Sequence, residues 1–159
     1  MTTSIRVLLP ALGLILLAGA AFGQTWKASC TNVGPASTEP LGPDGHALTV
    51  VTASCTIEGG PLNGGVGTQN VIWESAKGTS TLLSGDGVAR KVGGTAAYRL
   101  TGGTLTPTLK DGQPAGWTAS GTAVFTMGVG EAAALKGKSF TWTSKMSAPR
   151  QYVTENKMD

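Results

Sequence analysis

The stretch WTASGTAVFTM, residues 117–127, alternates between two kinds of side chain. One set combines aromatic, small and apolar residues: Trp117, Ala119, Gly121, Ala123, Phe125 and Met127. Between them lie the hydroxyl-bearing residues Thr118, Ser120, Thr122 and Thr126. Successive side chains of a β-strand point to opposite faces, so this pattern predicts a strand with one buried face and one solvated face.

The same alternation recurs along the chain, and helical periodicity is almost absent after residue 23. Pairs such as Gly93-Gly94, Gly102-Gly103 and Asp111-Gly112 supply the positive φ angles that hairpin turns need. Leu105 and Leu109 are expected to share an inner face. Residues 131–136, with three alanines before Gly137, predict one short helical turn. We expect strands near residues 24–31, 47–58, 68–76, 80–91, 95–101, 104–110, 116–127 and 138–146, with Gly85-Asp86-Gly87 bulging or splitting the fourth.

These strands predict an all-β domain, a single antiparallel up-and-down barrel of about eight strands. Closing the sheet removes its exposed edges, and a barrel of this size holds side chains or one small ligand. A two-sheet sandwich is the alternative architecture. The barrel is expected to cover residues 24–147, followed by a polar C-terminal tail over residues 148–159.

Residues 7–21, VLLPALGLILLAGAA, form a short apolar block directly after Arg6. With the small residues Ala21 and Gly23 after it, this block predicts a secretory signal peptide over residues 1–23. It is shorter than the ~20 residues that span a bilayer, so we expect no membrane span and an exported protein, periplasmic or extracellular. The net charge of +3 comes from scattered side chains, which argues against a nucleic-acid partner.

Two cysteines, Cys30 and Cys55, are the only ones in the chain. An even number of cysteines in an exported protein predicts a disulfide, here a structural link between the first two strands. Their spacing does not match a CxxC redox or metal-binding pair. We therefore expect a structural bridge, with no metal site and no cofactor.

Seven aromatic residues stand at predicted strand positions, and six of them are the candidate ligand-binding residues: Trp73, Tyr98, Trp117, Phe125, Phe140 and Trp142. They either fill the barrel or line a pocket. The single histidine, His46, follows a Pro-Asp-Gly turn and is expected to be solvated. Glu58 and Glu74 lie in predicted strands but have no fixed separation, so no catalytic residue is assigned.

Residues 92–105, VGGTAAYRLTGGTL, resemble the GGTGxYxxxxG-type hairpin of small antiparallel barrels related to allene oxide cyclase and plant dirigent proteins, with Ala96 replacing a glycine. Residues 130–140, GEAAALKGKSF, resemble it more loosely. The resemblance implies an antiparallel barrel that binds a hydrophobic small molecule. It matches no catalytic residue.

The leading hypothesis is an exported, non-catalytic β-barrel that binds a small apolar ligand. The first alternative is a protein-interaction module, such as a hydrolase inhibitor that inserts loop 32–45 or 59–67 into its partner. The second is a cofactor-free isomerase. The oligomeric state is left open.

Overall fold

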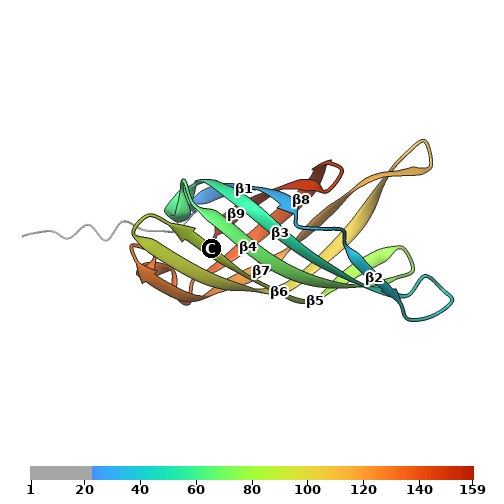
Figure 1. Ribbon diagram of the computed structural model, residues 1–159, viewed down its shortest axis with the longest axis horizontal. Helices are drawn as coiled ribbons and strands as arrows, with labels where there is room; N and C mark the ends of the chain where they lie inside the picture. Colours follow the sequence, from blue (N-terminus) through green and yellow to red (C-terminus); the bar gives the residue numbers. More distant parts are fainter. Residues whose placement is uncertain (1–22) are drawn as a thin grey trace, which may run out of the picture.

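The computed structural model describes residues 23–159, the side chain of Pro114 apart, and shows nine strands in one antiparallel sheet. Eight of them close into an up-and-down barrel, as predicted, because β1 pairs with both β9 and β3 (Figure 1). The short β2 pairs with the start of β3, beyond the segment that β1 covers. The strands are β1 (Thr25–Asn32), β2 (Ser37–Pro40), β3 (Ala47–Gly59), β4 (Val66–Ala76), β5 (Thr79–Lys91), β6 (Gly94–Lys110), β7 (Gln113–Gly130), β8 (Ser139–Ala148) and β9 (Gln151–Met158).

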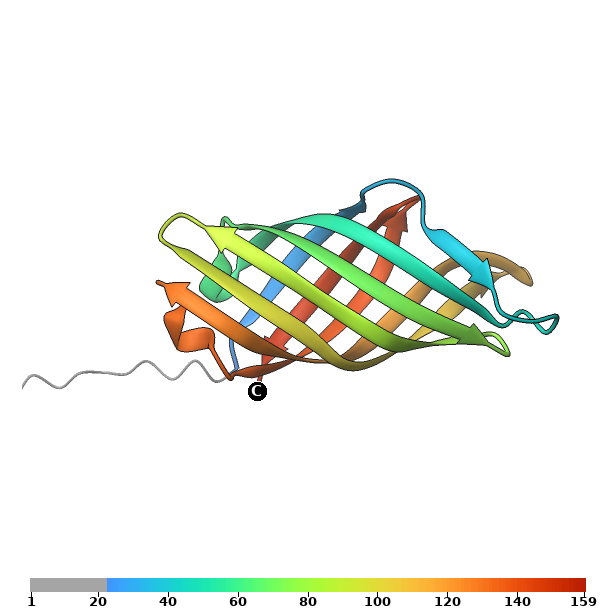
Figure 2. The ribbon, with the colours of Figure 1, turned by 60° about the horizontal axis from the view of Figure 1, so that its bottom comes forward.

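The two ends of the barrel differ. Two single-turn 3-10 helices, η1 (Gly60–Leu62) and η2 (Ala133–Leu135), lie at one end, called here the plugged end (Figure 2). The short helical turn predicted at 131–136 is thus confirmed as η2. Connections at residues 33–36, 41–46, 77–78, 111–112 and 149–150 form the other end, called here the open end.

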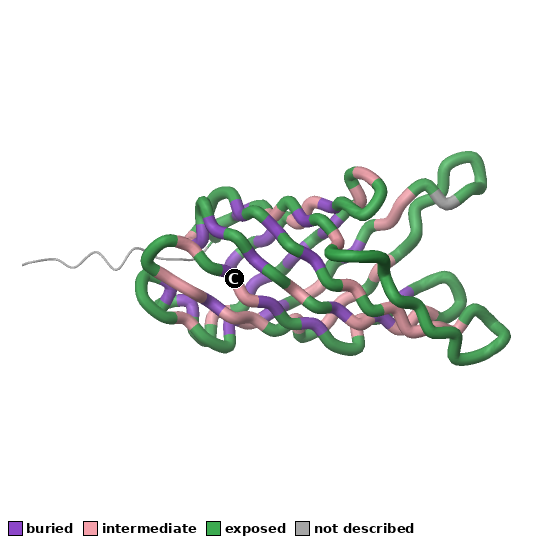
Figure 3. The backbone as a smooth tube through the Cα atoms, viewed as in Figure 1, coloured by how far each residue is buried: buried purple, intermediate pink, exposed green. Residues whose placement is uncertain are grey.

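The apolar core is concentrated at the plugged end. The rings of Trp26, Phe125 and Phe140 pack in tilted contacts there, with centroids 5.2 Å apart for Trp26 and Phe140 and 4.9 Å for Phe125 and Phe140. Leu62 from η1 and Leu135 from η2 are buried beneath them. Figure 3 shows the buried residues in this half of the barrel and exposed residues along the hairpins at the open end.

The predicted disulfide is present. Cys30 and Cys55 are direct register partners on β1 and β3, and their sulfurs are bonded. A loop of this length contributes roughly 3–4 kcal/mol in the chain-entropy model. The bridge fixes the seam at which β1 joins β3 and closes the barrel.

The predicted C-terminal tail, residues 148–159, is wrong. Residues 151–158 form β9, which pairs with β8 and with β1 and so belongs to the barrel. Its inward positions are Tyr152, Thr154, Asn156 and Met158, and two of these four are polar. The polar inner residues hid the alternation that would have predicted a strand.

The predicted division between residues 95–101 and 104–110 is also wrong. Both segments belong to β6, and Gly102-Gly103 is not a turn. The register passes from Leu100–Ala123 to Gly102–Thr122, so Thr101 is an extra residue in a β-bulge. The predicted count of about eight strands agrees with the eight in the barrel because this split and the missing β9 offset each other.

Two residues predicted to face inward are exposed. A second bulge, at Thr126, shifts the alternation so that Met127 is 42% exposed. Leu109 is 64% exposed because the β6–β7 hairpin extends past the rest of the barrel (Figure 1). The predicted signal peptide, residues 1–23, lies outside the described residues except for Gly23.

Candidate functional site

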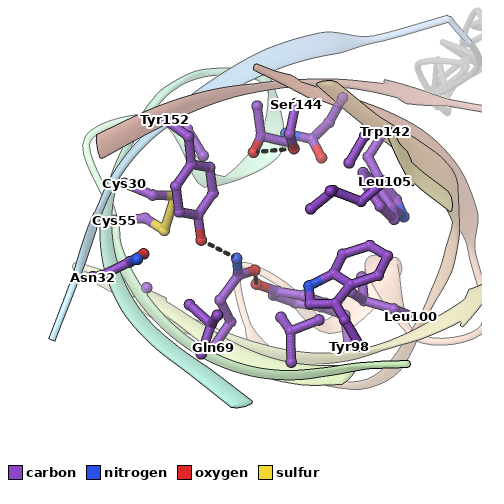
Figure 4. Close-up of a pocket in the computed structure, with 18 of the residues that line it drawn as sticks. Cys30, Asn32, Cys55, Gln69, Tyr98, Leu100, Leu105, Trp142, Ser144 and Tyr152 are labelled. Carbon is purple, nitrogen blue, oxygen red and sulfur yellow. Dashed lines mark hydrogen bonds between the residues drawn. A yellow bond between two sulfur atoms is a disulfide. The ribbon is translucent and has the colours of Figure 1, made fainter. Parts of the chain in front are cut away.

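A cavity of about 320 Å³ occupies the barrel interior (Figure 4). All six aromatic residues predicted to face the interior line it: Trp73, Tyr98, Trp117, Phe125, Phe140 and Trp142. Phe125 and Phe140 are 1% and 4% exposed and belong to the apolar core at the plugged end. The other four lie farther along the wall. The aromatics therefore both fill the plugged half and line the rest of the lumen.

Glycines next to the large rings explain why the lumen is not filled. Gly121 is the register partner of both Trp142 and Gly103. A Cβ at Gly103 would lie 2.7 Å from Cζ2 of Trp142, and one at Gly121 would lie 2.6 Å from the same atom. The Trp142 ring therefore covers these two residues, called here the glycine floor.

A hydrogen bond holds the Trp142 ring in this position. Its Nε1 donates to the carbonyl oxygen of Thr122 at 3.2 Å. Tyr98 repeats the arrangement, because its ring covers its register partner Gly87. Aromatic rings that cover wall glycines are a recognised way to stabilise glycine in a sheet. Here they also leave the centre of the barrel unoccupied by side chains.

A chain of polar side chains crosses one side of the cavity. Tyr98 donates its hydroxyl proton to Oε1 of Gln69 at 3.0 Å. Nε2 of Gln69 donates to the hydroxyl oxygen of Tyr152 at 2.5 Å. The chain joins β6, β4 and β9, and both bonds are visible in Figure 4.

Two further hydrogen-bonded pairs line the cavity, and one buried polar atom has no partner. Ser75 and Ser80 share a hydrogen bond of 2.7 Å, and Ser144 and Thr154 share one of 2.8 Å. Oδ1 of Asn32 is buried and has no hydrogen-bond partner. Buried polar atoms are nearly always paired, so this atom needs explaining.

Gln69, Tyr152 and Asn32 also line the cavity and are not among the predicted site residues. Gln69 occupies an inward position of β4 between Gly67 and Val71, where alternation alone would have placed it in the lumen. Tyr152 falls within the predicted tail, and Asn32 within the predicted loop 32–45. An unbroken strand pattern through these segments would have revealed all three.

No Asp, Glu, Lys, Arg or His is found among the cavity-lining residues of the described chain. The titratable groups are the phenols of Tyr98 and Tyr152. Burial raises the pKa of Tyr152 to about 12, although its hydrogen bond from Gln69 opposes the shift. Burial, followed by the proximity of Tyr152 and Asp86, raises the pKa of Tyr98 further. The cavity is thus uncharged at neutral pH.

These shifts predict that stability falls at alkaline pH. The unfolded tyrosines ionise near pH 10, whereas the folded ones stay protonated, so their contribution is complete below pH 10 and is lost towards pH 12. Phenolate absorbance should show neither tyrosine ionising at its usual pH while the barrel is folded. Tyr152→Phe should leave Tyr98 as the only source of phenolate absorbance. A phenolate signal with a midpoint near 10 in the folded protein would contradict the prediction.

The three residues considered for catalysis lie elsewhere. Nε2 of His46 lies 2.7 Å from Oε1 of Glu74, so the histidine is paired rather than simply solvated. Glu74 follows the inward-facing Trp73 and so points to the outside of the barrel. Glu58 is exposed on β3. None of the three lines the cavity.

Within residues 23–159, no group of three or more His, Cys, Asp or Glu side chains is arranged to hold a metal ion. None of the helices in this part of the chain is long and apolar enough to cross a membrane. No protein-family model, curated protein or solved structure matches the chain. Its function is therefore inferred from the chemistry of the cavity.

Proposed function

We propose that this protein is an exported binding module that holds a small, largely apolar molecule inside its barrel and does not act on it as an enzyme. The observation that carries the proposal is the aromatic-lined cavity of about 320 Å³, whose surface is mostly apolar and carries no charged side chain. Small-molecule sites typically occupy ~300–1,000 Å³ and combine apolar walls with a small number of placed polar groups.

Two features support a location outside the cytoplasm. The apolar block behind Arg6 has the composition of a secretory signal. The disulfide between Cys30 and Cys55 fits an oxidising compartment. An extracytoplasmic carrier or sensor of an apolar compound would need this combination of a stable shell and a largely apolar interior.

Filling the cavity tests the proposal. Leu105 lines the lumen and is partly buried against the core, so Leu105→Trp should occupy space a ligand needs. We expect at least about a tenfold loss of affinity for the neutral dye N-phenyl-naphthylamine, since the larger ring displaces it. Affinity is measured from the dye's fluorescence, which rises in apolar surroundings.

The matched control is Thr104→Trp, one residue earlier on the exposed face of β6. It adds the same ring without entering the cavity and should bind the dye like the unmodified protein. Native mass spectrometry of the exported protein adds a second measurement, because a retained ligand gives a defined mass increment. Failure of the unmodified protein to bind the dye or to retain a small molecule would overturn the proposed function.

A further inference from the structure

Two hydrogen-bonding groups on the Asn32 side of the cavity lack a protein partner. The first is the acceptor Oδ1 of Asn32, which is buried and unpartnered. The second is the hydroxyl proton of Tyr152. In the polar chain the Tyr152 oxygen accepts from Gln69, so its own O–H is still free to donate.

The backbone holds Asn32 in place at the end of β1. Its N–H donates to the carbonyl oxygen of Arg150 at 2.9 Å, and a guanidinium nitrogen of Arg150 donates to its carbonyl oxygen at 3.1 Å. Its register partner is Ala53, whose partner on β4 is Gln69. Only Ala53, which is fully buried, separates the two amides along this row.

Figure 4 shows Asn32 and Tyr152 on the same side of the lumen, with Leu105, Leu100 and Trp142 across from them. One wall of the cavity therefore offers both a donor and an acceptor, and the opposite wall is apolar. A single hydroxyl group satisfies both polar positions because it can donate and accept at once. A hydroxyl can also hydrogen-bond to either end of the Asn32 side-chain amide, because it can donate to the amide oxygen or accept from the amide nitrogen.

We infer that the ligand is an uncharged, mainly apolar molecule with one hydroxyl group, seated with that hydroxyl against Asn32 and Tyr152 and its apolar body against Trp142 and the two leucines. This inference rests on the proposed function and narrows the class of ligand. An ionised group would have to leave water without any opposite charge in the cavity, which is costly. Carboxylates and ammonium compounds are therefore rejected.

Four naphthalene compounds of nearly equal shape test the inference by displacing N-phenyl-naphthylamine at neutral pH. β-Naphthol carries the hydroxyl, β-methoxynaphthalene can only accept, naphthalene has no polar group, and β-naphthoate is an anion. We expect β-naphthol to bind about tenfold more tightly than the methoxy compound and naphthalene. We expect β-naphthoate to bind about a hundredfold more weakly than β-naphthol, or not at all.

Asn32→Leu should abolish the preference for β-naphthol over β-methoxynaphthalene and leave binding of naphthalene unchanged. Asn70→Leu is the matched control, since Asn70 is exposed on the outer face of β4. If Asn32→Leu does not fold, Tyr152→Phe removes the donor instead and should reduce the same preference. Equal affinity of the unmodified protein for all four compounds would overturn the inference and leave the proposed function standing. Binding of none of the compounds or the dye would overturn both.

Discussion

A chain that ends at Ala148 is expected not to fold. It lacks β9, and with it both the β8–β9 and the β1–β9 ladders. It also loses the buried side chains Tyr152 and Met158, which are 6% and 1% exposed. Burial of two such side chains contributes ~3–6 kcal/mol, and the whole domain is expected to have a stability of only ~5–15 kcal/mol. The open seam would also expose two strand edges.

Far-ultraviolet circular dichroism and a denaturant titration measure this effect. The control ends at Met158 and removes only the exposed Asp159, so it should unfold at the same denaturant concentration as the full chain. A cooperative transition in the chain that ends at Ala148 would show that β9 is dispensable, as a tail would be.

The composition of β9 explains why the sequence pattern did not predict it. A strand is recognised when its inward positions are apolar, but β9 directs Thr154 and Asn156 into the barrel. There Thr154 has a hydrogen-bonding partner in Ser144, so its polar side chain is tolerated. β9 also pairs with β1, which is far away in sequence, and this pairing becomes apparent only when the barrel closes.

The β-bulges at Thr101 and Thr126 are a second feature that the sequence pattern did not predict. Residues 117–125 follow strict alternation, and the structure places their inner set as predicted. At Thr126 one extra residue changes the phase, and at Thr101 another allows β6 to continue where a Gly-Gly pair predicted a turn. Bulges depend on pairing between two strands, so a pattern within one strand does not reveal them.

Of the residues that line the cavity, the sequence pattern predicted only aromatic ones as ligand-binding residues. Aromatic residues at alternating positions indicate an interior face regardless of the exact register, and all six line the cavity. The polar half depends on Asn32, Gln69 and Tyr152; Asn and Gln are usual on surfaces, and Tyr is intermediate in burial. Their role follows from the closure of the barrel, which places β9 and β4 on either side of the joined β1 and β3.

The glycine floor determines where the Trp142 ring lies and so how much of the lumen stays open. Trp142 can leave the lumen open only if its ring has room against β6 and β7, and this room exists because Gly103 and Gly121 have no side chain. A residue with a Cβ at either position would push the ring towards the centre. Small residues in the wall thus determine the volume available inside.

Gly121→Ala is accordingly expected to have a large effect on both stability and binding. The new Cβ would collide with the carbonyl oxygen of Gly102 and lie 2.6 Å from Cζ2 of Trp142, so either the strand or the ring must move. Overpacking of this kind costs ~1–3 kcal/mol and sometimes more. A denaturant titration measures the loss of stability, and dye binding measures the loss of cavity volume.

Gly102→Ala is the matched control, one position away from Gly103 on β6. Its Cβ would approach only Oγ1 of Thr122, at 3.8 Å, and would not touch the Trp142 ring. We expect a change in stability within about 0.5 kcal/mol and unchanged dye affinity. Both substitutions add one methyl group, and they lie on neighbouring strands. A difference in stability or dye affinity between the two variants therefore measures the contribution of the glycine floor. Equal stability and equal dye affinity of the two variants would mean that Trp142 does not need the glycine floor to leave the lumen open.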